Sequence, residues 1–266
     1  MINISFIGCG NMGFAFASAL SGNKEYSITL YSPHSAKDKA KKISVQATSS
    51  LEEALKSADI VVLAVKPQVL PSLYKTLSNY SDKAFISLAA GVPLEVLSKE
   101  IKSEQIARFM PNLAASEKAS VTALCFSSSS SDKFKEEAFQ IAKEVGSAFI
   151  LDEAQFSAFI GISGSAIAFI FEFVHALALG GTREGIAYNT SVAIATETLE
   201  SAAKVLKASG DNPAALMSRV CSAGGTTIKG MEALYSLSFD SSVISAVVAS
   251  CTKSIELEKS ALERIK

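Results

Sequence analysis

The sequence has few of the side chains from which many enzymes build their active sites. Its 266 residues include two histidines and four cysteines, and tryptophan is absent. The cysteines, which form no C-x-x-C pair and have no histidine beside them, are Cys9, Cys125, Cys221 and Cys251. Such scatter is typical of reduced thiols in a cytoplasmic protein. It argues against a zinc centre or a catalytic triad, and we expect no metal site.

An excess of charge of one sign is also missing. The 25 Lys and Arg residues are balanced by 26 Asp and Glu residues, which gives a formal net charge of -1. Such a chain has no positive field to collect the phosphates of a nucleic-acid backbone. Only Met1 precedes the first apolar run, so no basic segment or cleavage site indicates a secretory leader. We therefore expect neither a nucleic-acid partner nor secretion.

Apolar residues, by contrast, make up 48% of the chain, and the mean hydropathy is +0.29. The longest apolar stretch, residues 158–181, has the length that a bilayer span needs. Four glycines interrupt it, and no Lys or Arg lies between Lys143 and Arg183. Because a membrane helix usually carries basic anchors near its ends, we interpret the stretch as a buried helix and expect no membrane association.

Residues 1–152 alternate short apolar runs with amphipathic segments. Strands are predicted at residues 2–7, 27–31, 45–48, 59–65, 84–89, 105–110, 120–126 and 147–151. Helices are predicted between the early strands, at residues 11–20, 35–42 and 51–57. The run 59–65 is apolar on both faces, as expected of a central parallel strand with helices on each side. The alternation predicts a doubly wound α/β domain over residues 1–152.

After about residue 152 the strand signal stops and helical periods take over. The predicted helices cover residues 153–162, 164–179, 182–208, 213–221, 226–235 and 241–265. The second and third of these helices have apolar residues on more than one face, which a single helical layer cannot cover. We therefore expect an all-α second domain, residues 153–266, whose helices pack against those of a second copy.

The pattern G-x-G-x-x-G, from Gly8 to Gly13, directly follows the first predicted strand and opens the first predicted helix. In that context Gly8 permits a tight turn, and Gly10 lets the backbone approach a diphosphate. Gly13 allows the helix to pack closely on the strand. The helix N-terminus adds N–H donors and the positive end of its dipole. The motif therefore predicts a dinucleotide site.

The end of the second strand bears on which nucleotide binds. An NAD-selective site usually has Asp or Glu there, whereas this chain has the segment Tyr31 to Ser35, with Lys37 nearby. Hydroxyl groups and a lysine suit a ribose 2′-phosphate, so NADPH is favoured over NADH. An ordinary polar turn that caps the next helix is the alternative interpretation.

Two more strand ends lie at the edge of the sheet where open α/β folds bind ligands. Lys66 and Pro67 follow the central strand, with Lys66 directed toward the nucleotide crevice. Ala89 ends the next strand among small residues that leave room for a ring. A plain strand exit would have a similar sequence at either place.

Two segments of the helical half contain glycines at predicted helix starts. One leads into Ser165, and the other runs from Gly224 through Gly225 to Thr226 and Thr227. Glycines followed by threonines at a helix N-terminus offer N–H and O–H donors that suit a small carboxylate. A helix junction capped by Thr226 is the simpler alternative.

Six motifs, in this order, resemble those of the pyrroline-5-carboxylate reductase family. They are residues 6–13, 64–67, 89–92, 108–112, 161–165 and 224–228. The resemblance runs from Ile2 to about Glu258 and implies an N-terminal Rossmann domain and an all-helical C-terminal domain that dimerises by interleaving. It also implies reduction of 1-pyrroline-5-carboxylate, a cyclic imino acid, to L-proline with NADPH or NADH.

The resemblance implies three groups of site residues. The diphosphate and the adenosine ribose would contact Gly8, Gly10, Asn11, Met12, Ser32 and His34. The nicotinamide side would be lined by Lys66, Pro67, Ala89 and Asn112. The substrate carboxylate would be held by Ser165, Gly224, Gly225, Thr226 and Thr227. Thr227 matches the hydroxyl that the family places next to the ring nitrogen, which makes it the candidate catalytic residue.

The chain departs from the family pattern in the substrate half and not in the nucleotide loop. Ala166 and Ile167 stand in place of glycine and proline, Ala223 replaces proline, and Leu113 replaces threonine. These changes leave open a related cyclic imine as substrate. They also leave open a catalytically silent NADPH-binding protein.

A second enzymatic alternative is a β-hydroxyacid dehydrogenase relative, which would share the glycine-rich start and a helical second domain. That family needs a lysine for acid–base catalysis about nine residues after the glycine that matches Gly161. The residue there is Ile170, so hydroxyacid oxidation would lack its proton acceptor.

Overall fold

The computed structural model describes the chain from Met1 to Ile265, except for the side chains of Ala261, Arg264 and Ile265. Lys266, the last residue of the predicted second domain, lies outside the described residues. The chain divides into two units. Unit 1 comprises Met1–Gly164 together with the chain from Ser250 onward, and unit 2 comprises Ser165–Ala249. The expected boundary between residues 152 and 153 stays a prediction.

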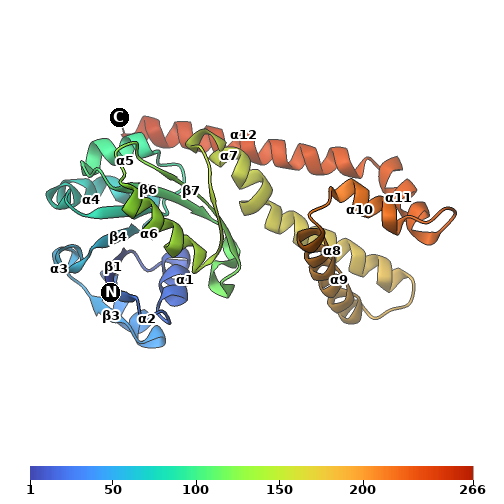
Figure 1. Ribbon diagram of the computed structural model, residues 1–266, viewed down its shortest axis with the longest axis horizontal. Helices are drawn as coiled ribbons and strands as arrows, with labels where there is room; N and C mark the ends of the chain where they lie inside the picture. Colours follow the sequence, from blue (N-terminus) through green and yellow to red (C-terminus); the bar gives the residue numbers. More distant parts are fainter. Residues whose placement is uncertain (266) are drawn as a thin grey trace. The chain divides into compact units, whose positions relative to one another are not determined.

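Unit 1 is built on an eight-stranded sheet with the order β3-β2-β1-β4-β5-β6-β7-β8 (Figure 1). Its strands are β1 (Ile2–Ile7), β2 (Tyr26–Tyr31), β3 (Gln46–Thr48), β4 (Ile60–Leu63), β5 (Ala84–Ser87), β6 (Ile106–Pro111), β7 (Ser120–Phe126) and β8 (Gly146–Ile150). All neighbours are parallel except β6 and β7. The strand order reverses between β1 and β4, which is the switch point where such sheets bind ligands.

Helices cover both faces of this sheet (Figure 1). One face packs against α1 (Asn11–Leu20), α2 (Ala36–Ile43) and α6 (Asp132–Lys143). The other packs against α3 (Leu51–Ser57), α4 (Leu70–Leu77), α5 (Leu94–Ile101) and α7 (Phe156–Phe159). Within β4, Ile60 and Val62 enter the first core while Val61 and Leu63 enter the second. The doubly wound architecture is therefore confirmed.

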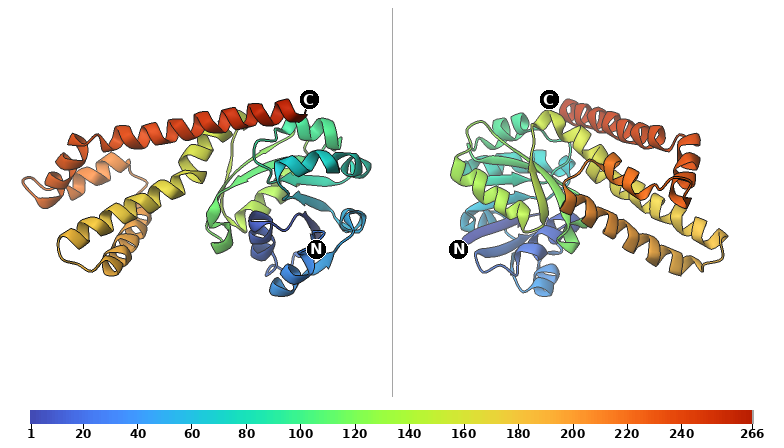
Figure 2. Two further views of the ribbon diagram at one scale, coloured as in Figure 1. Left: turned by 180° about the vertical axis from the view of Figure 1, so that it is seen from behind. Right: turned by 45° about the vertical axis from the view of Figure 1, so that its right-hand side comes forward.

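Unit 2 contains only helices throughout residues 165–249, all of which the structure describes. They are α8 (Ala166–Arg183), α9 (Tyr188–Ser209), α10 (Pro213–Val220), α11 (Thr226–Ser236) and the first part of α12 (Phe239–Ile265). Helices α8 and α9 lie side by side, as Figure 2 shows. The prediction that strands give way to helices is confirmed.

The predicted start of the helix over residues 182–208 is wrong. Helix α8 continues through Gly180 and Gly181 to Arg183, and the chain turns at Gly185, whose φ is +96°. A Cβ on Gly181 would lie 2.5 Å from the Ser191 Oγ of α9. The glycine in α8 therefore allows two helices to approach closely, and only the later glycine provides the turn.

The apolar stretch singled out in the sequence lies within Glu153–Arg183, which is long and apolar enough to cross a membrane. Its most apolar window has a mean hydropathy of 1.8, yet only 11% of that window is buried. Large apolar side chains such as Ile162 and Phe171 are exposed in the single chain. Burial of this stretch thus does not occur within one copy, and its burial against a second copy stays a prediction.

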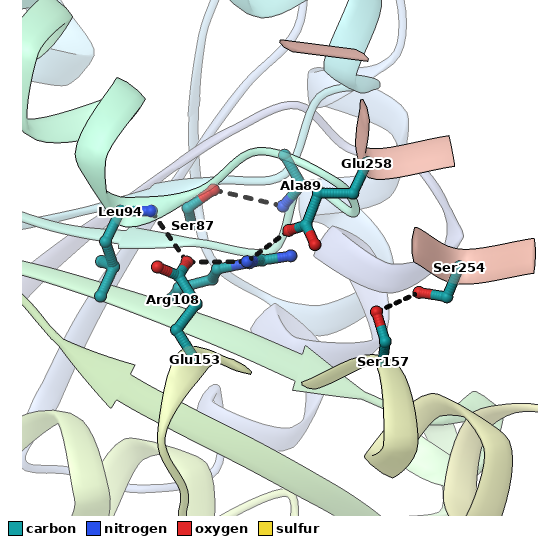
Figure 3. Close-up of polar contacts among 8 residues, drawn as sticks. All are labelled: Ser87, Ala89, Leu94, Arg108, Glu153, Ser157, Ser254 and Glu258. Atoms are coloured by element: carbon teal, nitrogen blue, oxygen red, sulfur yellow. Dashed lines mark hydrogen bonds and ion pairs between the residues drawn. The ribbon is translucent and has the colours of Figure 1, made fainter. Parts of the chain in front are cut away.

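A buried cation joins several segments of unit 1, as Figure 3 shows. Arg108 on β6 is 2% exposed, and its Nη1 donates to Glu153 Oε1 at 2.7 Å and to Glu258 Oε1 at 3.0 Å. Its guanidinium carbon lies 5.0 Å from the ring centroid of Phe156. Glu153 Oε1 also accepts the N–H of Leu94 at 2.8 Å. The starts of α5 and α7 and the end of α12 are therefore all fixed to β6.

We predict that Arg108→Met lowers the free energy of unfolding by about 3 kcal/mol, because two carboxylates then face each other without their shared cation. Urea unfolding of the purified protein measures this change. The control is Lys133→Met, which removes an exposed lysine 3.7 Å from Glu137 and should cost less than about 0.5 kcal/mol. Equal, small losses in both variants would contradict the structural importance of the Arg108 cluster.

Candidate active site

The predicted cofactor residues of unit 1 gather at a single edge of the sheet. Strands β1, β2, β4, β5 and β6 are mutually parallel, so their carboxyl ends meet at that edge. The residues that follow these strands are Gly8, Gly10, Asn11, Met12, Ser32, His34, Lys66, Pro67, Ala89 and Asn112. The structure thus places all ten on the two sides of the switch point between β1 and β4.

The glycine loop between β1 and α1 is shaped by two close contacts. Gly8 has a φ of +106°, and a Cβ there would lie 2.8 Å from the carbonyl group of Ala64. A Cβ on Gly13 would lie 2.6 Å from both Ala64 Cβ and the Gly8 carbonyl oxygen. Gly10 is exposed, and apart from its two chain neighbours no residue has an atom within 4 Å of a Cβ built there. Packing thus requires the outer glycines, while the middle glycine faces open space.

The first turn of α1 has the properties of an anion site. Gly10 is the N-cap, and no side chain of the loop caps the helix. The first turn contains no acidic residue, so the positive end of the helix dipole is not neutralised from within the helix. The open position at Gly10 and these N–H groups fit the diphosphate of a dinucleotide.

The turn after β2 is organised by Ser32. Its Oγ accepts the N–H groups of His34 at 3.5 Å and Ser35 at 3.3 Å, and it lies 3.1 Å from Ser35 Oγ. Ser35 precedes α2 but makes no side-chain capping bond. His34 and Lys37 are both exposed. Selection of a 2′-phosphate by this turn stays a prediction.

On the predicted nicotinamide side, the exposed Lys66 immediately precedes a short 3-10 helix, Pro67–Val69, in which Pro67 is the first residue. Proline suits this position because a first helical N–H has no partner within the helix. Ala89 is buried, and its N–H donates to Ser87 Oγ at 3.3 Å (Figure 3).

Asn112 is buried, and its side-chain amide is already engaged. Oδ1 accepts the N–H groups of Ala114 at 3.2 Å and Val121 at 3.3 Å, while Nδ2 donates to Ser163 Oγ at 3.2 Å. These bonds hold the end of β6 against β7 and the segment before α8. Asn112 therefore shapes the edge of the sheet, and its contact with a nicotinamide stays a prediction.

The predicted substrate residues all belong to unit 2. Ser165 immediately precedes α8, and its carbonyl accepts the N–H of Ala168 at 2.9 Å. Gly224 has a φ of +68°, and the N–H of Gly225 donates to the carbonyl of Ser222 at 3.0 Å. This turn leads directly into α11.

The alternative in which Thr226 caps this helix is wrong. The N-cap is Gly225, which has no side chain, and Thr226 and Thr227 are the first two helical residues. A Cβ on Gly225 would lie 2.3 Å from Ser222 Oγ and 3.2 Å from the Ser222 carbonyl oxygen, so a larger residue would crowd this turn. The first N–H groups of α11 point outward with a positive dipole end, as a carboxylate site needs.

Sequence analysis did not single out Lys39 or the partners of Arg108. Lys39 lies on α2, and its Nζ donates to the carbonyl of Cys9 inside the glycine loop. Its position four residues after Ser35 places it on the same helical face as the polar turn, which was the available signal. Burial raises the pKa of the neighbouring Cys9 thiol, so Cys9 acts as a packing residue rather than a nucleophile.

Two family models match the chain. Residues 153–257 match the model described as pyrroline-5-carboxylate reductase dimerisation. Residues 3–91 match the model described as NADP oxidoreductase, coenzyme F420-dependent. The two matches fall on the helical half and on the first part of the sheet, respectively.

Relatives with curated names extend over nearly the whole chain. The pyrroline-5-carboxylate reductase of Methanosarcina acetivorans is 32% identical over 265 residues, covering 96% of this chain and 98% of the relative. That of Escherichia coli is also 32% identical, over 269 residues, covering 97% and 98%. That of Aquifex aeolicus is 30% identical over 259 residues.

Solved structures have the same fold. The pyrroline-5-carboxylate reductase of Coxiella burnetii has a TM-score of 0.90 and 28% identity, covering 96% of this chain and 98% of its own. The pyrroline carboxylate reductase of Plasmodium falciparum, solved with NADP bound, has a TM-score of 0.86 and 26% identity. It covers 97% of this chain and 98% of its own.

A mostly parallel sheet with an open glycine loop at its switch point, followed by a helical unit, defines an NAD(P)H-dependent oxidoreductase. Within that class, identities of 30% and above over nearly the full length decide the assignment. The chain belongs to the pyrroline-5-carboxylate reductase family. The resemblance drawn from six short motifs is thereby confirmed, as is a nicotinamide dinucleotide as cofactor.

We predict that alanine at Gly10 weakens NADPH binding, whereas alanine at Gly13 lowers the stability of the fold. Gly10→Ala should raise the Kd for NADPH at least tenfold, about 1.4 kcal/mol, because its methyl group enters the space of the diphosphate. Its unfolding free energy should change by less than about 1 kcal/mol. Gly13→Ala should lower that free energy by about 1–3 kcal/mol through overpacking against Ala64.

Fluorescence titration with NADPH and urea unfolding measure the two quantities on the same preparations. Each variant serves as the control for the other. A Gly10→Ala protein that binds NADPH as tightly as the unaltered protein would place the diphosphate elsewhere.

Proposed function

We propose that this chain is a pyrroline-5-carboxylate reductase that converts 1-pyrroline-5-carboxylate to L-proline, the last step of proline biosynthesis. The observation that carries this function is membership of the family over nearly the full length of the chain. The open glycine loop at the switch point supports it, because the reaction needs a bound nicotinamide dinucleotide. NADPH is the preferred donor, and NADH can replace it.

The reaction needs little acid–base machinery. A cyclic imine protonated on nitrogen is already an electrophile, and the reduced nicotinamide supplies a hydride when bound. What the protein must add is orientation of the imine carbon, which can contribute several kcal/mol to lowering the barrier. Because orienting the imine needs no acid–base residue, the presence of only two histidines in the chain is consistent with this reaction.

The substrate is anchored at the start of α11. Thr226 and Thr227, the first two residues of α11, offer backbone N–H donors to the carboxylate, and the dipole of α11 favours a negative charge there. The Thr227 hydroxyl, directly or through a water, supports the ring nitrogen. In the described part of the chain no hydrogen bond engages this hydroxyl, so it is available to a ligand.

We further propose that the protein works as a homodimer, or as a larger assembly of dimers, in the cytoplasm. The family model for dimerisation matches the helical residues 153–257. Exposed apolar side chains on α8 and α9, among them Phe171, Leu179 and Ile194, are suited to burial against a second copy. This arrangement accounts for an apolar helix that would otherwise be exposed to water.

The decisive experiment is oxidation of NADPH by the purified protein in the presence of 1-pyrroline-5-carboxylate, repeated with NADH. We expect loss of the nicotinamide absorbance with the imine and none with ketones derived from β-hydroxyacids. Turnover of the ketones would instead support the β-hydroxyacid dehydrogenase relative. NADPH binding without any turnover would identify a catalytically silent protein.

We predict that Thr227→Val lowers kcat/KM for the imine by roughly tenfold to a hundredfold, because one hydroxyl donor to the reacting ring is lost. The Kd for NADPH should not change. The matched control is Thr196→Val, since the Thr196 hydroxyl is bonded within its own helix to the carbonyl of Val192. Unaltered turnover and KM in Thr227→Val would show that the assigned role is wrong.

A further inference from the structure

Lys39 places a positive charge against the glycine loop from outside the glycine motif. It lies on α2 and is half-buried, and its Nζ donates to the carbonyl of Cys9. The ammonium also lies 5.3 Å from the ring centroid of Phe14 on α1. Among the residues that the structure describes, no carboxylate comes within 4.0 Å of this Nζ. The charge therefore has a carbonyl and a ring as partners, but no anion.

The ammonium of Lys39 adds a positive charge beside the N-terminus of α1. The N-terminus of α1 is the positive end of a helix dipole, which disfavours a nearby cation and stabilises an anion. The first turn of α1 contains no acidic side chain to compensate. A ligand with negative charge at the loop would neutralise both the dipole and the ammonium, and the diphosphate of a dinucleotide has that charge.

The bond to Cys9 also determines which way the next N–H points. In a trans peptide the C=O and the N–H lie on opposite sides of the chain. Lys39 engages the carbonyl of the Cys9–Gly10 peptide, so the Gly10 N–H is directed away from α2. That N–H has no acceptor in the described part of the chain, and the space around Gly10 is open.

We propose that Lys39 is a positioning residue of the dinucleotide site. It fixes the Cys9–Gly10 peptide so that the Gly10 N–H faces the diphosphate, and its charge adds to the attraction for that group. This inference rests on the proposed function of the loop and assigns a role to a residue outside its motif. Because NADPH and NADH share the diphosphate, Lys39 acts on both, unlike a residue that contacts the 2′-phosphate.

The test uses three variants of the full-length protein. Lys39→Met keeps an unbranched aliphatic side chain but removes the donor and the charge, whereas Lys39→Arg keeps both the donor and the charge. Lys41→Met removes an exposed lysine from the same helix and is the matched control. The Kd values for NADPH and NADH are measured by fluorescence titration, with Tm for each variant. KM and kcat are then measured with each reduced dinucleotide.

We expect Lys39→Met to raise both Kd values by roughly tenfold and by the same factor, with kcat retained at saturating dinucleotide. Lys39→Arg should restore most of the affinity, and Lys41→Met should bind both as the unaltered protein does. A loss confined to NADPH would identify a 2′-phosphate contact and overturn the proposal. Unchanged Kd values, with or without a lower Tm, would also overturn it.

Failure of the proposed function is recognised separately. If the unaltered protein binds neither NADPH nor NADH, the dinucleotide site itself is wrong, and the role of Lys39 is overturned with it. If the unaltered protein binds both and only the variants deviate from expectation, the assignment of Lys39 alone is overturned.

Discussion

The close contact between the glycine loop and the end of β4 is the constraint on which the cofactor site depends. Two positions without side chains, Gly8 and Gly13, allow the first turn of α1 to lie against Ala64. This contact places the N-terminus of α1 at the switch point, beside the ends of β2 and β4. Any larger residue would separate helix from strand, and the N–H donors would no longer point toward the open space at Gly10.

The second organising element is strand β6, which anchors the chain where it leaves unit 1 and where it returns. At one position Arg108 binds the carboxylate of Glu153, in the 3-10 helix just before α7, and that of Glu258 on α12. Beside it, Ser157 Oγ and Ser254 Oγ lie 3.0 Å apart (Figure 3). At the end of the strand, Asn112 bonds to Ser163. The buried guanidinium of Arg108 imposes this arrangement, because a charge away from water needs anionic partners, which the two partly exposed carboxylates supply.

The chemistry proposed for this chain matches its composition. A hydride donor and an electrophilic imine react without a strong acid or base from the protein. Backbone N–H groups, hydroxyl groups and the ammonium of Lys39 are therefore sufficient to form the proposed site. The substituted positions Ala166, Ile167 and Ala223 lie next to the helix starts that would hold the substrate. Helices α8 and α11 nevertheless begin at these positions, and Gly225 is the N-cap of α11. The nucleotide loop is therefore conventional, and the differences lie on the substrate side.

Elements with a local sequence pattern can be predicted before the fold is known. Strand β1 and helix α1 have the predicted bounds. Strand β4 is buried on both faces, as its uninterrupted run of apolar residues predicts. Six short motifs likewise predicted the family, which the relatives confirm. Contacts between residues far apart in the sequence could not be predicted in this way, because they form only in the folded chain. Gly181 permits helix packing against Ser191, and Arg108 meets Glu258 across 150 residues. Lys39 reaches Cys9 across 30 residues, because only the folded chain brings α2 against the loop.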